Sequence, residues 1–265
     1  AGTTATATAA AVAAAVATAT DLTSVTITGS KNLTVTASSK NTALATVNAD
    51  AFTGSEFTLI AGSGTTQAAM TVTVPTTTKA TITTGKGADT VTVGDGGTAG
   101  TNTITTGDGA DTIVSGAGAD TINSGDDGGS ITSGAGDDNI TSGDGVDTIV
   151  LGDGDDTVVT SGAGADVITG GAGNDTVTTA GTGADSIDGG EGNDTLSGGA
   201  DNDTILGGAG NDTLNGDAGN DSIVGGDGND TITDGAGNDT VTGGDGVDTI
   251  TISTGNDNVD AGAGN

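Results

Sequence analysis

From residue 85 onward the sequence repeats one short pattern about every nine residues: glycine, any residue, glycine, any residue, aspartate, any residue, and an aliphatic residue. The segment from Gly208 to Leu214 is a clean copy, and a second copy follows it directly. A short period kept over so many copies predicts a fold made of similar stacked units. The aspartate of the pattern, called the slot aspartate below, falls at Asp89, Asp111, Asp120, Asp138, Asp147, Asp156, Asp166, Asp175, Asp185, Asp194, Asp203, Asp212, Asp221, Asp230, Asp239, Asp248 and Asp257.

An aliphatic residue lies two positions after each slot aspartate, and this row favours a folded core. A net charge of −32, 52 glycines and 1% aromatic residues would otherwise be typical of a disordered chain. A solvated polymer gives no reason for aliphatic residues to keep one spacing, so we favour a repeating buried core. The row comprises Val91, Ile113, Ile122, Ile131, Ile140, Ile149, Val158, Ile168, Val177, Ile187, Leu196, Ile205, Leu214, Ile223, Ile232, Val241, Ile250 and Val259.

Each repeat divides into a glycine-rich turn and a short strand centred on the aliphatic residue. Glycine accepts positive φ in the turn, and β-branched residues favour the strand. Such a short strand is unstable alone, but parallel stacking of neighbours buries a continuous core. The interval is ten residues from Asp156 to Asp166 and again from Asp175 to Asp185, so the two insertions stack if each coil holds two repeats. The sequence therefore predicts an all-β parallel solenoid with two repeats per coil.

The repeat resembles the RTX family of calcium-binding nonapeptide repeats, whose pattern is Gly-Gly-x-Gly-x-Asp-x-aliphatic-x. The resemblance covers residues 85–265, although earlier copies replace the first glycine, as at Thr106 and Ser142. It implies a right-handed parallel β-roll with calcium held between stacked glycine-rich loops. It also implies that loop glycines bind calcium together with the slot aspartates. Those glycines are Gly171, Gly173, Gly190, Gly192, Gly208, Gly210, Gly219, Gly226, Gly228, Gly237, Gly244 and Gly246.

The residue types available agree with calcium as the metal. Calcium takes six to eight oxygen ligands in flexible geometry, and a glycine turn offers carbonyl oxygens beside a carboxylate. The chain has no Cys and no His for zinc, copper or iron. About 15 divalent ions would nearly neutralise the formal charge of −32. Calcium is doubtful at two loops, where Gly129 replaces the slot aspartate and Asp201 replaces a glycine.

Several aspartates lie at variable loop positions, and for these two interpretations stay open. Each either binds calcium or bonds to its own backbone as a turn residue. They are Asp95, Asp108, Asp144, Asp153, Asp217, Asp227 and Asp245.

The first eighty residues lack the aspartate loops and are expected to need no calcium. Residues 1–20 are almost only Ala and Thr, which predicts a linker or an irregular strand rather than a membrane span. Residues 21–80 predict a calcium-free β-rich segment, a solenoid or sandwich layer, that leads into the β-roll of residues 81–265. Within it, residues 22–35 predict two strands paired around a turn, and residues 44–47, 57–60 and 70–74 predict further strands.

Residues 22–91 also resemble the C-terminal part of RTX-type bacterial surface-layer proteins of the Caulobacter kind. That resemblance implies a calcium-dependent structural protein that self-assembles into a surface layer or matrix lattice on the cell exterior. The alternatives are an RTX adhesin or ice-binding region that presents a threonine ladder, and the secretion and folding domain of an RTX hydrolase. Catalysis within this chain is not expected, because it has no His, Cys, Trp, Tyr or Arg.

The two faces of the predicted roll differ in chemistry. Alternate repeats place mostly threonine outward on one face, whereas the other is more apolar, with Val150, Leu206 and Val224. We expect self-association through the apolar face, although Thr and Val also simply favour strands. Cell-surface polysaccharide is a further candidate partner, and we expect no nucleic acid and no transmembrane segment. The RTX resemblance implies an extracellular, cell-surface location reached by type I secretion.

Overall fold

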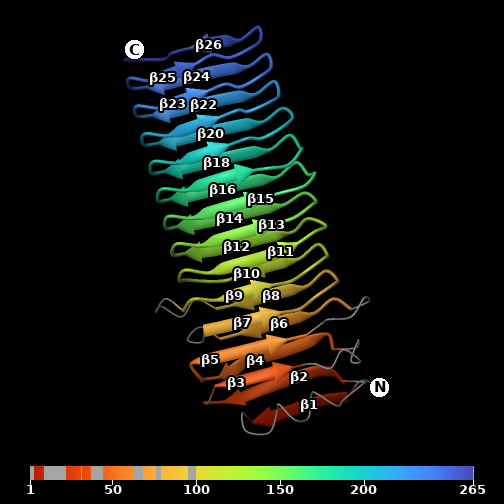
Figure 1. Cartoon of the computed structure of the whole chain (residues 1–265). Helices are drawn as coiled ribbons and strands as arrows, with labels where there is room; N and C mark the ends of the chain where they lie inside the picture. Colours follow the sequence, from red (N-terminus) through yellow and green to blue (C-terminus); the bar gives the residue numbers. More distant parts are fainter. Residues whose placement is uncertain are drawn as a thin grey trace. The chain divides into compact units, whose positions relative to one another are not determined.

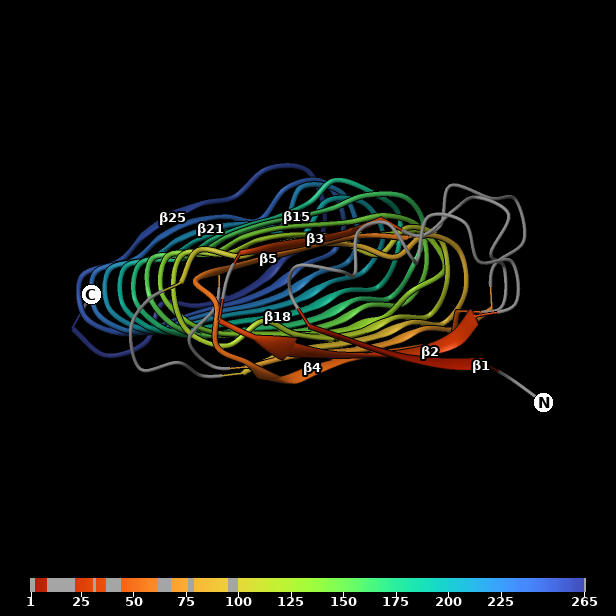
Figure 2. The ribbon, with the colours of Figure 1, turned by 90° about the horizontal axis from the view of Figure 1, so that it is seen from below.

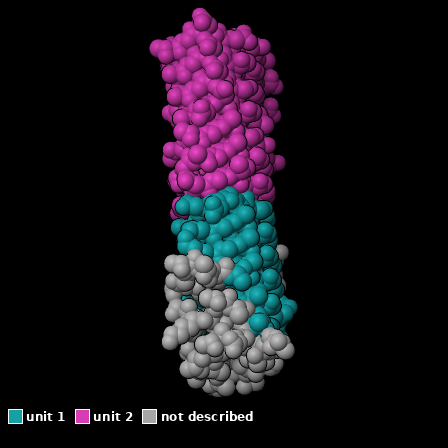
Figure 3. Space-filling view, turned by 90° about the vertical axis from the view of Figure 1, so that its right-hand side faces the viewer, with its two compact units in different colours: residues 1–136 teal, residues 137–265 magenta. Residues whose placement is uncertain are grey.

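The computed structural model describes residues 3–8, 22–30, 32–36, 44–61, 68–75, 79–94 and 100–264. Every regular element among these residues is a β-strand, and the strands form a parallel solenoid of about 12 turns (Figure 1). This confirms the predicted fold class. The chain divides into two compact units, residues 1–136 and 137–265 (Figure 3), which are described separately.

The first unit has two parallel sheets whose strands alternate along the chain. Figure 2 shows the coils as flattened loops with a layer of strands on either side. One sheet contains β1 (Thr3–Thr8), β2 (Leu22–Gly29), β4 (Thr46–Phe52), β6 (Thr71–Val74), β8 (Thr90–Val93), β10 (Thr112–Val114) and β12 (Ser130–Ala135). The other contains β3 (Leu33–Thr36), β5 (Glu56–Ile60), β7 (Lys79–Thr83), β9 (Thr103–Thr105) and β11 (Thr121–Gly125).

The second unit follows the same rule, and its strands come almost entirely from the repeat. One sheet contains β14 (Thr148–Asp153), β16 (Val167–Ala172), β18 (Ser186–Glu191), β20 (Thr204–Ala209), β22 (Ser222–Asp227), β24 (Thr240–Asp245) and β26 (Asn258–Asp260). The other contains β13 (Asn139–Ser142), β15 (Thr157–Thr160), β17 (Thr176–Thr179), β19 (Thr195–Ser197), β21 (Thr213–Asn215), β23 (Thr231–Thr233) and β25 (Thr249–Thr251).

The register stacks each residue on its equivalent in the next coil. Ile205 pairs with Ile223, which pairs with Val241, so the aliphatic row becomes a continuous core. Every member of the row from Val91 to Val241 is buried, whereas Val259 in the last described strand is 42% exposed. The coils hold two repeats each, as predicted. The two ten-residue repeats also stack, because Thr160 pairs with Thr179 one coil later.

The paired-strand prediction for residues 22–35 is wrong. β2 and β3 lie in different sheets, and each pairs with a strand of the next coil, β4 and β5 respectively. The turn between them carries the chain across the coil instead of back along the same sheet. The strands predicted at 44–47, 57–60 and 70–74 are present as β4, β5 and β6 with shifted ends.

Larger side chains fill the core of the first unit. Phe52 and Phe57 are both buried and meet edge to face, with ring centroids 5.9 Å apart. Leu44 and Met70 are also buried nearby in sequence. Among the described residues before residue 81, the only acidic residues are Asp50 and Glu56, and both are exposed. These coils are therefore held by apolar packing, and their independence of calcium stays a prediction.

Shortening one member of the aliphatic row tests the core. Leu196 is 1% exposed and stacks between Val177 and Leu214, so Leu196→Ala leaves a cavity between coils. We expect it to lower the free energy of unfolding by about 2–5 kcal/mol. Urea unfolding in excess calcium measures the effect. Val159→Ala, at a side chain 39% exposed, is the matched control and should change it by no more than about 0.5 kcal/mol. Equal losses in the two variants would contradict the stacked core.

Candidate metal centre

The slot aspartates form ladders along the edges of the coils. One carboxylate oxygen, Oδ1, accepts a hydrogen bond from the backbone N–H of the slot residue one coil earlier. The N–H of Asp194 donates to Asp212 Oδ1 at 2.8 Å, and that of Asp212 donates to Asp230 Oδ1 at 2.9 Å. All slot aspartates from Asp89 to Asp239 are buried, and Asp248 and Asp257 are partly exposed. The repeat spacing therefore puts a column of carboxylates inside the protein.

The second oxygen, Oδ2, has no such bond in many of these aspartates. It is buried and lacks a hydrogen-bond partner in Asp89, Asp111, Asp156, Asp175, Asp194, Asp203, Asp212, Asp221, Asp230 and Asp239. A buried acceptor without a partner is costly, and a buried charge more so. An ionised carboxylate oxygen of this kind is satisfied either by taking up a proton or by binding a cation.

The space beside Oδ2 is lined by another acceptor. A Cβ atom on Gly207 would lie 2.4 Å from Asp212 Oδ2 and 2.5 Å from the carbonyl oxygen of Gly225 in the next coil. Gly225 repeats this, with Asp230 Oδ2 and the Gly243 carbonyl oxygen both at 2.3 Å. Neither oxygen can donate a hydrogen bond to the other. A cation between them satisfies both, and hard oxygen ligands of this kind suit calcium.

Asn102 shows what the same position does without a charge. It replaces a slot aspartate, is 2% exposed, and its Oδ1 accepts the backbone N–H of Ala80. Its own N–H donates to Asp120 Oδ1, so it stands in the ladder. Its Nδ2 donates to the carbonyl of Ser115, the carbonyl that corresponds to Gly225 for Asp212. The amide therefore closes the gap itself, whereas a carboxylate leaves two acceptors facing each other.

The residue two positions after the central aliphatic residue of a strand is called the first position of the following loop. Its identity separates most loops into two groups. In the open group it is glycine, and a Cβ there would lie 2.3–2.7 Å from the slot Oδ2, closer than a real side chain can approach, so no side chain separates the loop backbone from that oxygen. The open loops begin at Gly170, Gly189, Gly198, Gly207, Gly216, Gly225 and Gly243. In the filled group a buried side chain takes that space, at Thr84, Thr106, Ser115, Ser124, Ser133, Ser142, Leu151, Thr160 and Thr179.

Burial also perturbs the carboxylates. It raises the pKa of Asp156 and of Asp203 to about 7, and neighbouring aspartates raise it further while the ladder hydrogen bond opposes the shift. Burial likewise raises the pKa to about 6 in Asp111, Asp175, Asp212 and Asp221. It raises the pKa of Asp89, Asp166, Asp185, Asp194 and Asp230 as well. Without a cation, the charged form is thus disfavoured along the ladder.

The loop glycines predicted as ligands have a clear structural role. A Cβ on Gly210 would lie 1.7 Å from the carbonyl oxygen of Gly192, so only glycine lets the two loops stack. All the predicted glycines except Gly219 have positive φ. Calcium binding by their carbonyls stays a prediction. Asp127, Asp201 and Asp217 also have positive φ, at 86°, 80° and 65°, because stacking imposes this conformation even where glycine is absent.

The two doubtful loops differ. The Gly129 loop has no carboxylate at the slot, and its first position is filled by buried Ser124. The Asp201 loop keeps a buried, unpartnered Asp203 Oδ2, which would lie 2.5 Å from a Cβ on Gly198. The geometry of the Asp203 loop therefore fits a cation, and that of the Gly129 loop does not.

The variable loop aspartates lie outside the ladders. Asp144, Asp153, Asp227 and Asp245 are exposed, Asp108 and Asp217 are partly exposed, and Asp95 lies outside the described residues. Asp217 accepts side-chain bonds from Ser197 and Asn215. For Asp217, as for the others, both interpretations stay open.

Sequence reasoning missed three sets of residues. The sequence pattern indicates the first-position glycines only as members of the repeat. It does not single out Asp234, a buried first-position residue. The third set is a pair of exposed asparagine ladders, in which each amide accepts bonds from the next asparagine. Asn211, for example, donates from N and Nδ2 to Asn193 Oδ1 at 2.8 and 3.1 Å. The recurrence of Asn before the slot aspartate could have revealed them. They comprise Asn174, Asn193, Asn211 and Asn229, and Asn202, Asn220, Asn238 and Asn256.

The parallel coils and the buried carboxylate ladders together define a metal-binding β-solenoid. A family model for the RTX calcium-binding nonapeptide repeat, which spans four copies, matches residues 97–131, 125–158, 158–180, 179–214 and 215–250. These matches cover more than half of the chain, which belongs to this family. Its repeats bind calcium and are typical of secreted, extracellular proteins. Neither the comparison with curated proteins nor that with solved structures gave a match. No described segment is an apolar helix of membrane-crossing length.

Filling an open loop tests the calcium position. Gly207 lacks positive φ, so Gly207→Ala brings no unfavourable φ, but its Cβ would lie 2.4 Å from Asp212 Oδ2 and 2.5 Å from Gly225 O and must displace these oxygens. We expect the variant to bind at least one calcium ion fewer by isothermal titration calorimetry. Ser142→Ala, at a first position that a side chain already fills, is the matched control and should keep the wild-type number. An unchanged count in Gly207→Ala would rule out the proposed position.

The raised pKa values predict an inverted pH dependence without calcium. A carboxyl whose folded pKa lies above its unfolded value stabilises the fold fully below about 3.8, and this contribution is lost as pH rises through 6 to 7. In metal-free buffer, urea unfolding followed by circular dichroism should therefore show a more stable protein at pH 4 than at pH 8. In saturating calcium the order should reverse, because protons compete with the ion. Greater metal-free stability at pH 8 would contradict the burial argument.

Proposed function

We propose that this chain is a structural protein of the bacterial cell exterior that folds and self-assembles when extracellular calcium fills its loops. The observation that supports it most is the facing pair of acceptors at most of the open loops, Asp212 Oδ2 and the Gly225 carbonyl for example. Acceptors buried against each other at successive coils oppose folding until a cation joins them. Binding and folding are then coupled, so the calcium concentration outside the cell controls the fold.

The open loops are the proposed main calcium sites. In each, the slot aspartate supplies Oδ2 and the next coil supplies a first-position carbonyl. Calcium contributes charge neutralisation and links two coils, and the chain orients the ligands through the ladder bonds and the glycine turns. The filled loops have less room beside the slot aspartate. We therefore propose fewer ions than the about 15 that charge neutralisation alone would suggest.

Self-assembly is proposed through the outer face of the sheet that contains β14, β16 and β20. Val150, Val167 and Leu206 on this face are 41%, 44% and 37% exposed. Thr169 and Asp188 interrupt the apolar residues, which lie in neighbouring strands of the sheet. A patch that is only partly apolar fits many weak, repeated contacts between copies better than one tight interface.

An adhesin or ice-binding role is the second candidate, and the opposite sheet of the second unit favours it. Thr176, Thr195, Thr213, Thr231 and Thr249 pair in consecutive register and are all exposed. Their hydroxyl groups form a row at the strand spacing of about 4.8 Å, which could match a regular lattice or a polysaccharide. In either role the repeats carry no catalysis, because the chain lacks His, Cys, Arg and Tyr. A hydrolase of this family would hold its catalytic residues elsewhere.

Calcium-dependent assembly separates these functions. Calcium should convert a largely unfolded chain into a β-rich one by circular dichroism, and then into sheets or filaments in negative-stain electron microscopy. The double variant Val150→Lys with Leu206→Lys should fold with calcium but stay monomeric by sedimentation. Thr195→Lys with Thr213→Lys, on the opposite face, is the matched control and should still assemble.

Two outcomes would contradict the proposal. Full β circular dichroism in excess chelator would exclude calcium-driven folding. A calcium-loaded chain that stays monomeric at high concentration would exclude self-assembly. Ice shaping or polysaccharide binding that is lost in the threonine variant would then favour the second candidate.

A further inference from the structure

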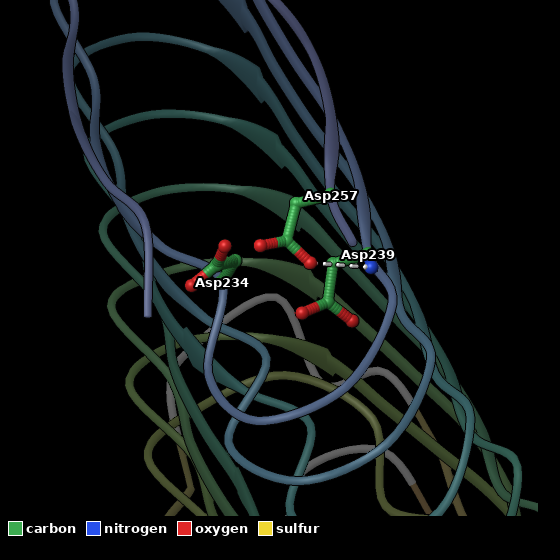
Figure 4. A group of neighbouring side chains, drawn as sticks. All are labelled: Asp234, Asp239 and Asp257. Carbon is green, nitrogen blue, oxygen red and sulfur yellow. Dashed lines mark hydrogen bonds between the residues drawn. The ribbon is translucent and has the colours of Figure 1, made fainter. Parts of the chain in front are cut away.

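One loop carries a third carboxylate where the open loops have glycine. Asp234 follows β23 and occupies the first position of the loop whose slot aspartate is Asp239. It is 0% exposed. One oxygen of each of Asp234, Asp239 and Asp257 lies within 4.8 Å of the others. Figure 4 shows Asp234 reaching across the loop toward the two slot aspartates.

The hydrogen bonds leave the interior of this cluster unsatisfied. Asp234 Oδ1 accepts the N–H of Ser253 at 2.8 Å, and Asp239 Oδ1 accepts the N–H of Asp221 at 2.8 Å. Asp257 Oδ1 accepts the N–H of Asp239 at 3.1 Å. Asp234 Oδ2 and Asp239 Oδ2 are buried and have no hydrogen-bond partner. Two buried oxygens of separate carboxylates thus remain without a donor in one small space.

The separation of the oxygens fits a common ion. Ligands bound to calcium at 2.3–2.6 Å can be at most about 5 Å apart, which is the span of this cluster. At the equivalent positions one and two coils earlier the residue is glycine, Gly216 and Gly198. The ladder therefore does not require a side chain at this place. The carboxylate of Asp234 is an addition to the ordinary loop, and it brings three carboxylates into one cluster.

We infer that Asp234, Asp239 and Asp257 form the tightest cation site of the chain, a three-carboxylate calcium site that fills before the open loops. Ligand charge is a main determinant of calcium affinity in protein sites. A third buried carboxylate strengthens attraction for a divalent ion and makes the empty site costlier. The inference depends on the proposed calcium-driven folding, but it concerns one site that the repeat pattern does not specify.

Competition with a chromophoric chelator tests the site in the full chain. Asp234→Asn keeps the shape of the side chain and removes its charge. It should weaken calcium binding at the tightest class of sites about tenfold or more. Asp234→Gly restores the residue of the open loops and should keep a site of ordinary affinity. Asp227→Asn removes an equal charge from an exposed loop position and should bind as the wild type does. This control separates ligation from a general change in net charge.

The outcomes distinguish this inference from the proposed function. If Asp234→Asn and Asp227→Asn bind calcium equally well at the tightest class of sites, the inference is wrong. If Asp234→Asn does not fold, the calcium affinity of Asp234→Gly is compared with that of the wild type. Equal affinity at the tightest class of sites overturns the inference. Failure of the wild-type chain to bind calcium would overturn the proposed function itself.

Discussion

The structure depends on a carboxylate buried at successive coils of the repeat. One oxygen of the slot aspartate accepts a backbone N–H from the coil before, as Asp212 does from Asp194, and so fixes the stacking of the loops. At the open loops the other oxygen faces a carbonyl, as Asp212 Oδ2 faces that of Gly225, whereas in some filled loops a threonine hydroxyl donates to the slot carboxylate, as Thr106 does to Asp111. The aspartate is therefore both the main connection between coils and the main obstacle to stacking them without metal. Apolar burial from residues such as Leu196 and Leu214 supplies the driving force, but it cannot remove this conflict.

Different loops resolve the conflict by different means. Asn102 resolves it without metal, since its amide donates to the carbonyl that a carboxylate would repel. Filled loops place a hydroxyl or an aliphatic group in the space, and their slot carboxyls are favoured in the protonated form, as burial of Asp111 shows. In the open loops burial also raises the pKa of the slot carboxyl, to about 7 in Asp203, so either a proton or a cation resolves the conflict there. The asparagine ladders align exposed loops regardless of metal. We therefore propose that dependence on calcium is concentrated where the first position is glycine, from Gly170 onward.

Spacing in the sequence predicted the fold because every repeat has the same local structure, a glycine-rich turn followed by a short strand. The aliphatic row gave the core, and the stacked ten-residue repeats gave two repeats per coil. The strands at residues 22–35 were assigned wrongly, because Gly29 and Asn32 favour a turn but do not specify whether the chain returns in the same sheet or crosses to the other. Likewise, the roles of Asn193 and Gly207 depend on what lies one coil away, eighteen or so residues along the chain. A local pattern carries no such information.

Buried and exposed carboxylates differ in their need for a bound ion, so net charge alone does not give the number of ions. Residues 87–265 hold 33 of the 36 acidic residues and none of the four lysines, so neutralising the whole charge would need about 15 or 16 divalent ions. Exposed carboxylates such as Asp153 and Asp245 need no bound ion, because water and dissolved salt screen them within about 10 Å. A buried carboxylate is screened by neither water nor dissolved salt. We therefore propose that the number of bound ions follows the loops whose first position is glycine, and the sequence shows these loops only once the residue at the first position is read together with its slot aspartate.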